Sequence, residues 1–343
     1  MQTERLSFDT IDQQQAVFGA QDDFAKMIEK ALEVRIGLRD YDVDVRGESE
    51  ENVRLATEVL RSLLQFYRRG EPLTESVVAR LIDEAREGSL EETFSAMDSI
   101  VTITQKGAPI KCKTLGQKNY IKALQENTVT LCIGPAGTGK TYLAVAQAAK
   151  ELKNGDIERI IMSRPAIEAG EERLGFLPGD LAQKVDPYLR PLYDALHDIF
   201  GAEKAEKLRE RGTIEIAPLA YMRGRTLNHA RVIIDESQNA SLPTLKMALT
   251  RLGEGSKMVL TGDVTQIDLP RSVDSGLERC AEILGGIEGI SVVRLNNRDV
   301  VRNKIVRDIV KAFEKDEAKR QAAKPAKPEK EKPRPTEAPR RKR

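Results

Sequence analysis

Between residues 114 and 313, short runs of apolar and β-branched residues alternate with stretches in which apolar residues recur at helical spacing. Most of these runs hold consecutive apolar residues, which is typical of strands covered on both faces. Strands that alternate with helices indicate a parallel sheet with right-handed helical crossovers. We therefore expect an α/β domain over residues 114–313. Its predicted strands are Thr128–Ile133, Arg159–Ser163, Thr213–Ala217, Arg231–Ile234, Lys257–Thr261 and Ile290–Leu295.

A smaller module is predicted ahead of this domain, over residues 19–70. Apolar residues at helical spacing between Phe24 and Leu32, and again between Val53 and Tyr67, predict two helices. Between them, apolar and polar residues alternate in two short segments, which predicts two strands. The order helix, strand, strand, helix indicates a small α+β module. Residues 1–18 show no clear periodicity, so we expect a flexible N-terminal segment there.

The other segments connect or extend these two units. Residues 71–113 are expected to form a connector of helix and strand, with one helix over residues 74–87 that Thr74 caps. Residues 314–343 are rich in Lys, Pro, Ala and Glu and cannot bury a core, which predicts a disordered tail. The tail holds 12 basic and 6 acidic residues and is therefore basic, whereas the rest of the chain carries a net charge of −5.

Composition excludes several classes of protein. Hydrophobic residues make up 40% of the chain and charged residues 32%, and no stretch resembles a membrane span or the apolar core of a signal peptide. Cys112, Cys132 and Cys280 lie far apart and without CxxC spacing, which predicts buried reduced thiols instead of disulfides or zinc ligands. We therefore expect a cytoplasmic protein without membrane contact.

The run Gly134-Pro-Ala-Gly-Thr-Gly-Lys-Thr141 follows the first predicted strand and leads into a helical stretch. Such a loop wraps around phosphate groups with its N–H groups, and the helix directs the positive end of its dipole at them. Lys140 adds a charge toward the β- and γ-phosphates of ATP, and the Thr141 hydroxyl can bind Mg²⁺. The alternative is a glycine-rich loop that binds nothing. The predicted nucleotide-binding residues here are Gly134, Pro135, Ala136, Gly137, Thr138, Gly139, Lys140 and Thr141.

Two acids end another buried strand, in the run Val232-Ile-Ile-Asp-Glu236. The carboxyl ends of parallel strands meet at the edge of a sheet where ligands bind. We expect Asp235 to hold Mg²⁺ together with Thr141, and Glu236 to orient or deprotonate the water that attacks the γ-phosphate. Taken alone, the motif would indicate ordinary surface acids at the end of a strand. Beside a phosphate loop, it favours hydrolysis over phosphoryl transfer to a small acceptor.

A third polar group follows a strand in Thr261-Gly-Asp-Val-Thr-Gln266. The amide of Gln266 is placed to contact the γ-phosphate or to position water. The alternative is a polar turn that bonds its own backbone. Lys140, Glu236 and Gln266 are therefore the catalytic residues that these motifs predict.

These motifs resemble those of a known family. Gly134–Thr141, Asp235–Asn239 and Thr261–Gln266 are similar to motifs I, II and III of superfamily 1 helicases. Two longer stretches, Arg164–Tyr193 and Ile214–Leu227, closely resemble the PhoH family of bacterial ATPases. The resemblance covers about residues 19–313 and implies a RecA-like P-loop domain that hydrolyses ATP with Mg²⁺. It also implies a role in RNA metabolism, with helicase-like activity on RNA and the endoribonuclease that matures ribosomal RNA as a partner.

This sequence departs from the family pattern at two points. Ser237 stands where the usual Asp-Glu-Ala-Gln-Asn run has alanine, but both acids remain, so we expect activity. The N-terminal module is similar to a KH domain, yet it lacks the Gly-x-x-Gly loop with which KH domains clamp RNA. Direct RNA binding by this module and a role in packing or assembly both remain open.

The resemblance also suggests a role for Gln117, which precedes the first strand of the α/β domain. A glutamine upstream of a helicase-like motif I often reads adenine, because its amide supplies one donor and one acceptor to the purine edge. The alternative is a residue that belongs to the start of a helix.

An arginine that stabilises charge on the γ-phosphate is expected for ATP hydrolysis. Two-domain helicases supply it from a second RecA-like domain, whereas one such domain fits here. The arginine must come from this domain or from a neighbouring subunit, which indicates a homo-oligomer, most simply a ring. The candidates are Arg223, Arg225 and Arg302, of which Arg302 is counted among the catalytic residues. For each, helix capping or surface pairing is the alternative.

Arg164 follows the second predicted strand, at the position where helicases contact the nucleic-acid backbone. The acidity of the body argues against a broad RNA-binding surface, so we expect single-stranded RNA to make local contacts. The tail, which ends in Arg340-Arg-Lys-Arg343, either adds electrostatic affinity for RNA or keeps the protein in solution.

The motifs predict an ATPase, and the family resemblance implies that it is coupled to rRNA maturation or to RNA remodelling with a ribonuclease partner. The first alternative is an ATP-dependent scaffold that recruits the nuclease without motor activity. The second is a small-molecule kinase, which would release a phosphorylated product in place of free phosphate.

Overall fold

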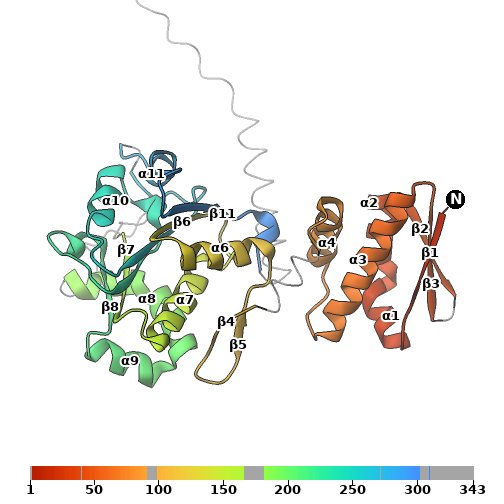
Figure 1. Cartoon of the computed structure of the whole chain (residues 1–343), viewed down its shortest axis with the longest axis horizontal. Coiled ribbons are helices and arrows are strands. Elements are labelled where there is room, and N and C mark those ends of the chain that lie inside the picture. Colours follow the sequence, from red (N-terminus) through yellow and green to blue (C-terminus); the bar gives the residue numbers. More distant parts are fainter. Residues whose placement is uncertain are drawn as a thin grey trace, which may run out of the picture. The chain divides into compact units, whose positions relative to one another are not determined.

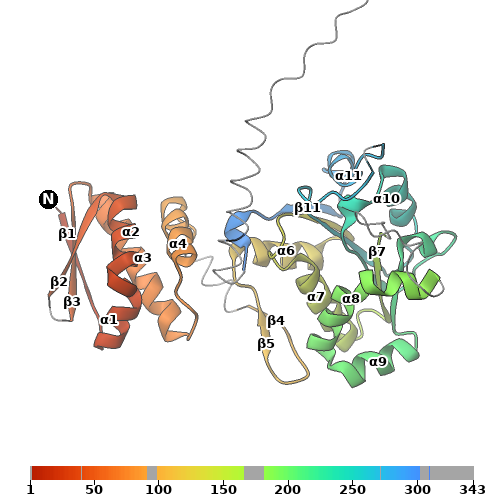
Figure 2. The same cartoon turned by 180° about the vertical axis from the view of Figure 1, so that it is seen from behind.

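The computed structural model describes residues 2–39, 41–90, 99–165, 181–270, 272–301 and Ile309, with residues 181–188 described in their backbone alone. Figures 1 and 2 show an N-terminal module and a larger α/β domain. Arg302 and the predicted tail, residues 314–343, lie outside the described residues. Among the helices that are described, none has the length and apolar character needed to cross a membrane.

The N-terminal module is a three-stranded antiparallel sheet with helices packed against it. Its sheet order is β1-β3-β2, and the helices and strands predicted between Phe24 and Tyr67 are confirmed. The apolar residues of these elements, among them Ile28, Val43 and Leu60, form one buried cluster. The predicted α+β character is therefore confirmed. The elements are β1 (Gln2–Ser7), α1 (Ile11–Phe18), η1 (Ala20–Asp22), α2 (Asp23–Leu32), β2 (Val34–Arg39), β3 (Asp42–Gly47) and α3 (Glu50–Arg68).

The prediction of a flexible segment over residues 1–18 is wrong, because residues 2–18 hold β1 and α1. β1 pairs with β3 along its whole length, and α1 starts at an N-cap, Thr10, whose hydroxyl accepts a hydrogen bond from the Gln13 N–H. Only Val17 and Phe18 of α1 are buried, and β1 is an edge strand without a fully buried residue. Both elements therefore carry too few apolar residues to show a period.

The connector contributes to two different cores. α4 (Glu75–Glu87) starts at Thr74, whose hydroxyl accepts a hydrogen bond from the Val77 N–H as predicted, and it packs into the cluster of the N-terminal module. The antiparallel hairpin of β4 (Ile100–Ile103) and β5 (Pro109–Lys111) instead adds Val101 and Ile110 to the core of the α/β domain.

The α/β domain is built on a six-stranded parallel sheet. Each strand begins and ends within one residue of its predicted bounds. The strand order is β11-β6-β10-β9-β7-β8, in which β10 separates β6 from β9, as in RecA-like P-loop domains. The strands are β6 (Val129–Ile133), β7 (Arg159–Arg164), β8 (Ile214–Pro218), β9 (Ala230–Ile234), β10 (Lys257–Gly262) and β11 (Ile290–Arg294).

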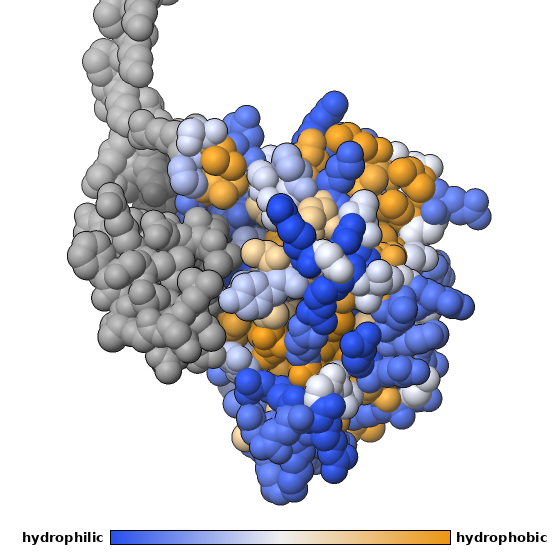
Figure 3. Space-filling view, turned by 90° about the vertical axis from the view of Figure 1, so that its left-hand side faces the viewer, coloured by the Kyte–Doolittle hydropathy of each residue, from blue (hydrophilic) through white to orange (hydrophobic). Residues whose placement is uncertain are grey.

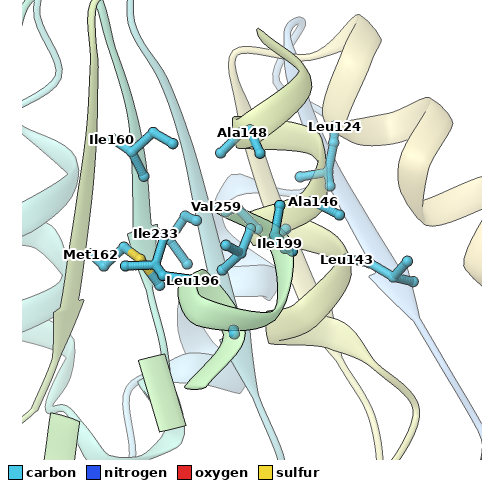
Figure 4. Packing of buried hydrophobic residues seen from close by; sticks show 14 of the residues in the cluster. Leu124, Leu143, Ala146, Ala148, Ile160, Met162, Leu196, Ile199, Ile233 and Val259 are labelled. Carbon is cyan, nitrogen blue, oxygen red and sulfur yellow. The ribbon is translucent and has the colours of Figure 1, made fainter. Parts of the chain in front are cut away.

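Helices cover both faces of this sheet. On one face, Leu196 and Ile199 lie in one buried cluster with Met162, Ile233 and Val259 (Figure 4). The layer on this face consists of α6 (Leu115–Glu126), α7 (Lys140–Asn154), α8 (Leu181–Phe200) and α9 (Ala202–Glu210). The other face packs against α10 (Leu242–Leu249) and α11 (Leu277–Leu284). Successive strand residues thus enter opposite cores, which explains their consecutive apolar residues. Figure 3 shows one outer face, where hydrophilic side chains predominate and hydrophobic ones lie between them.

The three cysteines, Cys112, Cys132 and Cys280, are buried and have free thiols, as predicted. Burial raises the pKa of each thiol, which keeps it protonated at neutral pH. Their role is therefore packing.

A close approach of two helices provides a test of the core beside α11. A Cβ atom added to Gly276 would lie 2.3 Å from the backbone nitrogen of Leu242 and 2.5 Å from its Cα. Since the Gly276 backbone, with φ −87° and ψ −10°, suits any residue, crowding alone opposes a side chain there. Gly276→Ala is expected to lower the free energy of unfolding in urea by about 1–3 kcal/mol. Gly37→Ala is the control, because an added Cβ at Gly37 would lie 4.0 Å from its nearest neighbour, the carbonyl oxygen of Asp44. Equal losses of stability in the two variants would contradict the packing at Gly276.

Candidate functional site

The glycine-rich run forms a tight loop between the buried strand β6 and the start of α7. Gly137 and Gly139 have φ values of +85° and +81°, a region that glycine adopts without steric cost. A Cβ atom at Gly134 would lie 2.7 Å from the carbonyl oxygen of Leu295. The glycines are therefore required by backbone conformation or by space. The loop ends at the N-terminus of α7, whose dipole favours an anion.

The side chain of Lys140 folds back into this loop. Its ammonium group donates hydrogen bonds to the carbonyl oxygens of Gly134, at 2.6 Å, and of Pro135, at 2.9 Å. Burial lowers the pKa of Lys140, while nearby carboxylates, including those of Asp263 and Glu236, act in the opposite direction. A cation is thus held next to the loop's phosphate-binding backbone.

Asp235 and the phosphate loop meet directly. The Thr141 hydroxyl donates a hydrogen bond to Asp235 Oδ1 at 2.6 Å, and the Thr261 hydroxyl of β10 donates one to the same oxygen at 2.8 Å. The phosphate loop follows β6 and Asp235 follows β9, and the sheet places β10 between these two strands. The hydrogen bond from Thr141 to Asp235 therefore spans the end of β10. A cavity of about 270 Å³ opens here, lined by the loop, by Asp235 and Glu236, and by residues of the turn after β10.

The donor set at this point suits Mg²⁺. A hydroxyl and a carboxylate oxygen are hard ligands, and Mg²⁺ is usually held by one or two carboxylates plus substrate phosphates and water. No group of three or more His, Cys, Asp or Glu residues forms a metal site among the described residues. Thr141 and Asp235 would therefore hold the ion together with the nucleotide.

Glu236 lies beside Asp235 with both carboxylate oxygens engaged. Arg164, the last residue of β7, donates a hydrogen bond to Oε1 at 2.7 Å, and Gln238 donates one to Oε2 at 2.5 Å. The backbone of Glu236 is left-handed, with φ +51°. Few residues other than glycine adopt this conformation, and those that do concentrate at functional sites.

The turn after β10 braces the phosphate loop. Asp263 Oδ2 accepts hydrogen bonds from the Ala136 N–H and from the Gln266 amide, both at 2.9 Å. Gln266 lines the cavity, and its contact with the γ-phosphate or with water stays a prediction. The turn also bonds its own backbone, as the alternative interpretation has it, because Asp263 Oδ1 accepts a hydrogen bond from the Thr265 N–H at 2.9 Å. Gln238 links this turn to Glu236, because its amide also bonds the backbone of Asp263 and Gln266.

Gln117 lies behind the loop. Its side-chain oxygen accepts a hydrogen bond from the Lys113 N–H at 2.6 Å, and its amide nitrogen donates one to the Thr138 carbonyl at 3.0 Å. The residue is buried in the first turn of α6. It therefore supports the loop from the helix, while adenine recognition by Gln117 stays a prediction.

The candidate arginines have different surroundings. Arg225 donates two hydrogen bonds to the carboxylate of Glu215, at 2.5 and 2.7 Å, and this pairing lowers the pKa of Glu215. Arg225 thus makes the surface pair that was its alternative interpretation. Arg223 is exposed after η3 (Leu219–Met222), and Arg302 lies outside the described residues.

Three features of the site were not predicted from the sequence. Asp263 binds the loop backbone, Gln238 joins two motifs, and Arg164 pairs with Glu236. The position of Asp263 and Gln238 within polar runs after strands was the available signal. Ser237, in η4 (Ser237–Asn239), donates a hydrogen bond from its hydroxyl group to the Ile234 carbonyl at 2.8 Å, which satisfies this buried polar group.

Comparisons with known proteins identify the family of the chain. The family model described as PhoH-like protein matches residues 109–314. A PhoH-like protein of Bacillus subtilis is 52% identical over 89% of this chain and 95% of its own length. One of Synechocystis is 46% identical over 88% and 92%, and Protein PhoH of Escherichia coli K12 is 39% identical over 78% and 73%. The chain belongs to the PhoH-like protein family of helicase-related P-loop NTPases.

Proposed function

We propose that the protein hydrolyses ATP with Mg²⁺. The observation that carries this proposal is the meeting of Thr141 and Asp235 at 2.6 Å, beside Lys140 and Glu236 in one cavity. A phosphate-binding loop, a pair of magnesium ligands and an acid that can activate water are thereby within reach of one triphosphate.

The residues divide the chemistry between them. The loop backbone and Lys140 bind the β- and γ-phosphates, and Thr141 and Asp235 hold the metal ion, which when bound neutralises charge on the phosphate oxygens. Glu236 accepts a proton from the attacking water or orients it in line with the γ-phosphate. Gln266 contacts the γ-phosphate from the turn after β10.

We propose in addition that single-stranded RNA stimulates this hydrolysis. Arg164 supports the proposal, since it lies at the carboxyl edge of the sheet beside Glu236 and retains a side-chain exposure of 21%. The family resemblance supports the endoribonuclease that matures ribosomal RNA as a partner. We also propose a homo-oligomer, in which a neighbouring subunit supplies the arginine that stabilises charge on the γ-phosphate. Of the candidates in the same chain, Arg225 is already paired with Glu215.

Phosphate release measured with and without single-stranded RNA tests the coupling. Wild-type protein is expected to release free phosphate from ATP several-fold faster with RNA, and the stimulation should fall steeply between low and moderate salt, because it depends on contacts with phosphates. Double-stranded DNA provides a control for charge alone. Hydrolysis that is indifferent to RNA would favour the ATP-dependent scaffold, and a phosphorylated small molecule without free phosphate would indicate a kinase.

A further inference from the structure

The inference concerns Arg164 and the acid beside it. β7 and β9 are parallel neighbours with Ser163 opposite Ile234, so the residues that follow each of these positions meet at the carboxyl edge. There, Arg164 bonds Glu236 Oε1 at 2.7 Å, and its Nε lies 4.0 Å from Asp235 Oδ2. The arginine therefore faces both acids of the nucleotide site.

This pairing restrains the acid that activates water. The guanidinium group of Arg164 holds Oε1 of Glu236 in a charge-assisted hydrogen bond, so this oxygen is engaged by the arginine and not by a water molecule. The other oxygen of Glu236 accepts a hydrogen bond from Gln238 at 2.5 Å. With a donor on each oxygen, the carboxylate of Glu236 is held toward Arg164 and Gln238 instead of toward a water molecule in the cavity.

Arg164 is also suited to bind another anion. Its side chain is 21% exposed, and that of Glu236 is 29% exposed, so the pair is reached from solvent. A guanidinium fork binds a phosphate diester in the same planar, bidentate way in which it binds a carboxylate. A phosphate placed at this edge would therefore compete with Glu236 for Arg164.

We propose that Arg164 is a latch on Glu236, and that a backbone phosphate of a bound RNA strand opens it. The proposal deepens the RNA-stimulated hydrolysis proposed above and rests on it. When the RNA phosphate binds the guanidinium group of Arg164, this group no longer bonds Glu236. The carboxylate of Glu236 can then orient the attacking water. Arg164 is in this role a positioning residue, which connects strand binding to hydrolysis through one side chain.

Thermodynamic linkage makes the latch measurable without any ATP. If RNA must draw Arg164 away from Glu236, then a neutral residue at position 236 lowers the cost of that step and strengthens RNA binding. The same substitution should have no such effect once Arg164 is absent. The coupling between the two residues is therefore visible in RNA affinity alone.

The test is a double-mutant cycle on RNA binding, read from the fluorescence anisotropy of a labelled oligouridine at fixed salt without nucleotide. Glu236→Gln is expected to bind RNA about 5-fold or more tightly than wild type. Arg164→Ala should bind more weakly, and Arg164→Ala with Glu236→Gln should match Arg164→Ala. Arg159→Ala is the matched control, since it removes an arginine from the amino end of the same strand, away from Glu236.

A second readout separates the latch from a loss of folding. Arg164→Lys keeps the charge but not the planar fork, and it is expected to raise hydrolysis without RNA and to reduce the stimulation by RNA. Equal RNA affinities of wild type and Glu236→Gln, in a wild type that RNA stimulates, would overturn the latch and leave the proposed function intact. A wild type that neither binds RNA nor responds to it would overturn both.

Discussion

Replacing Glu236 by glutamine is expected to slow phosphate release from ATP by about 10²–10⁴-fold while nucleotide binding is retained. Glutamine keeps the size of the side chain but cannot accept the proton of the attacking water. The phosphate loop, Lys140 and the contact between Thr141 and Asp235 remain in place. Single-turnover phosphate release and the affinity for a fluorescent ATP analogue measure the two effects separately.

Lys140→Ala is the complementary variant. It is expected to weaken nucleotide binding itself by about 10- to 100-fold, because a charge-assisted hydrogen bond contributes about 1.5–3 kcal/mol. Glu254→Gln is the control for Glu236→Gln, because it makes the same change at an exposed acid that precedes β10, at the end of the sheet away from the nucleotide site. It should bind and hydrolyse ATP as wild type does. Hydrolysis at the same rate by Glu236→Gln and wild type would remove Glu236 from the mechanism.

The largest effect on stability is expected at a buried ion pair. Arg231 of β9 is fully buried, and its guanidinium group donates hydrogen bonds to both carboxylate oxygens of Glu151 in α7 and to the Leu124 carbonyl. Arg231→Met leaves a buried carboxylate without its cation, which should lower the free energy of unfolding by about 3–5 kcal/mol.

Replacement of both partners should be much less harmful. The double variant Arg231→Met with Glu151→Leu removes both charges and is expected to be more stable than Arg231→Met alone. The exposed pair of Lys207 and Glu203 provides the matched control, since Lys207→Met should change stability by about 1 kcal/mol or less. Urea denaturation of the four proteins checks this. Similar decreases in the free energy of unfolding for Arg231→Met and Lys207→Met would show that the buried ion pair contributes no more to stability than the exposed one.

The fold of the α/β domain was predictable because its sheet is covered on both faces. Runs such as Val129–Ile133 and Ala230–Ile234 are buried throughout, so each strand stands out as an apolar segment. The edge strand β1 has no such signal, since it exposes most of its residues and depends on pairing with β3. The order of the strands in the sheet could not be predicted from patterns within single segments either, because it depends on how all strands and helices pack together.

For the site, the sequence identified which residues carry chemistry but not how they connect. The phosphate loop, Asp235 and Glu236 follow strand ends, and parallel strands bring such ends to one edge. The hydrogen bonds from Ala136 to Asp263 and from Arg164 to Glu236 depend on β10 and β7 being the neighbours of β6 and β9. Spacing along the chain carries no information about those neighbours.

A crystal structure of Glu236→Gln with Mg²⁺ and ATP tests the nucleotide site most directly. The site predicts the β- and γ-phosphates within the loop Gly134–Thr141, contacted by the Lys140 ammonium, with the metal ion on the Thr141 hydroxyl and near Asp235. Phosphates bound away from this loop, or a metal ion without contact to Thr141 and Asp235, would contradict it.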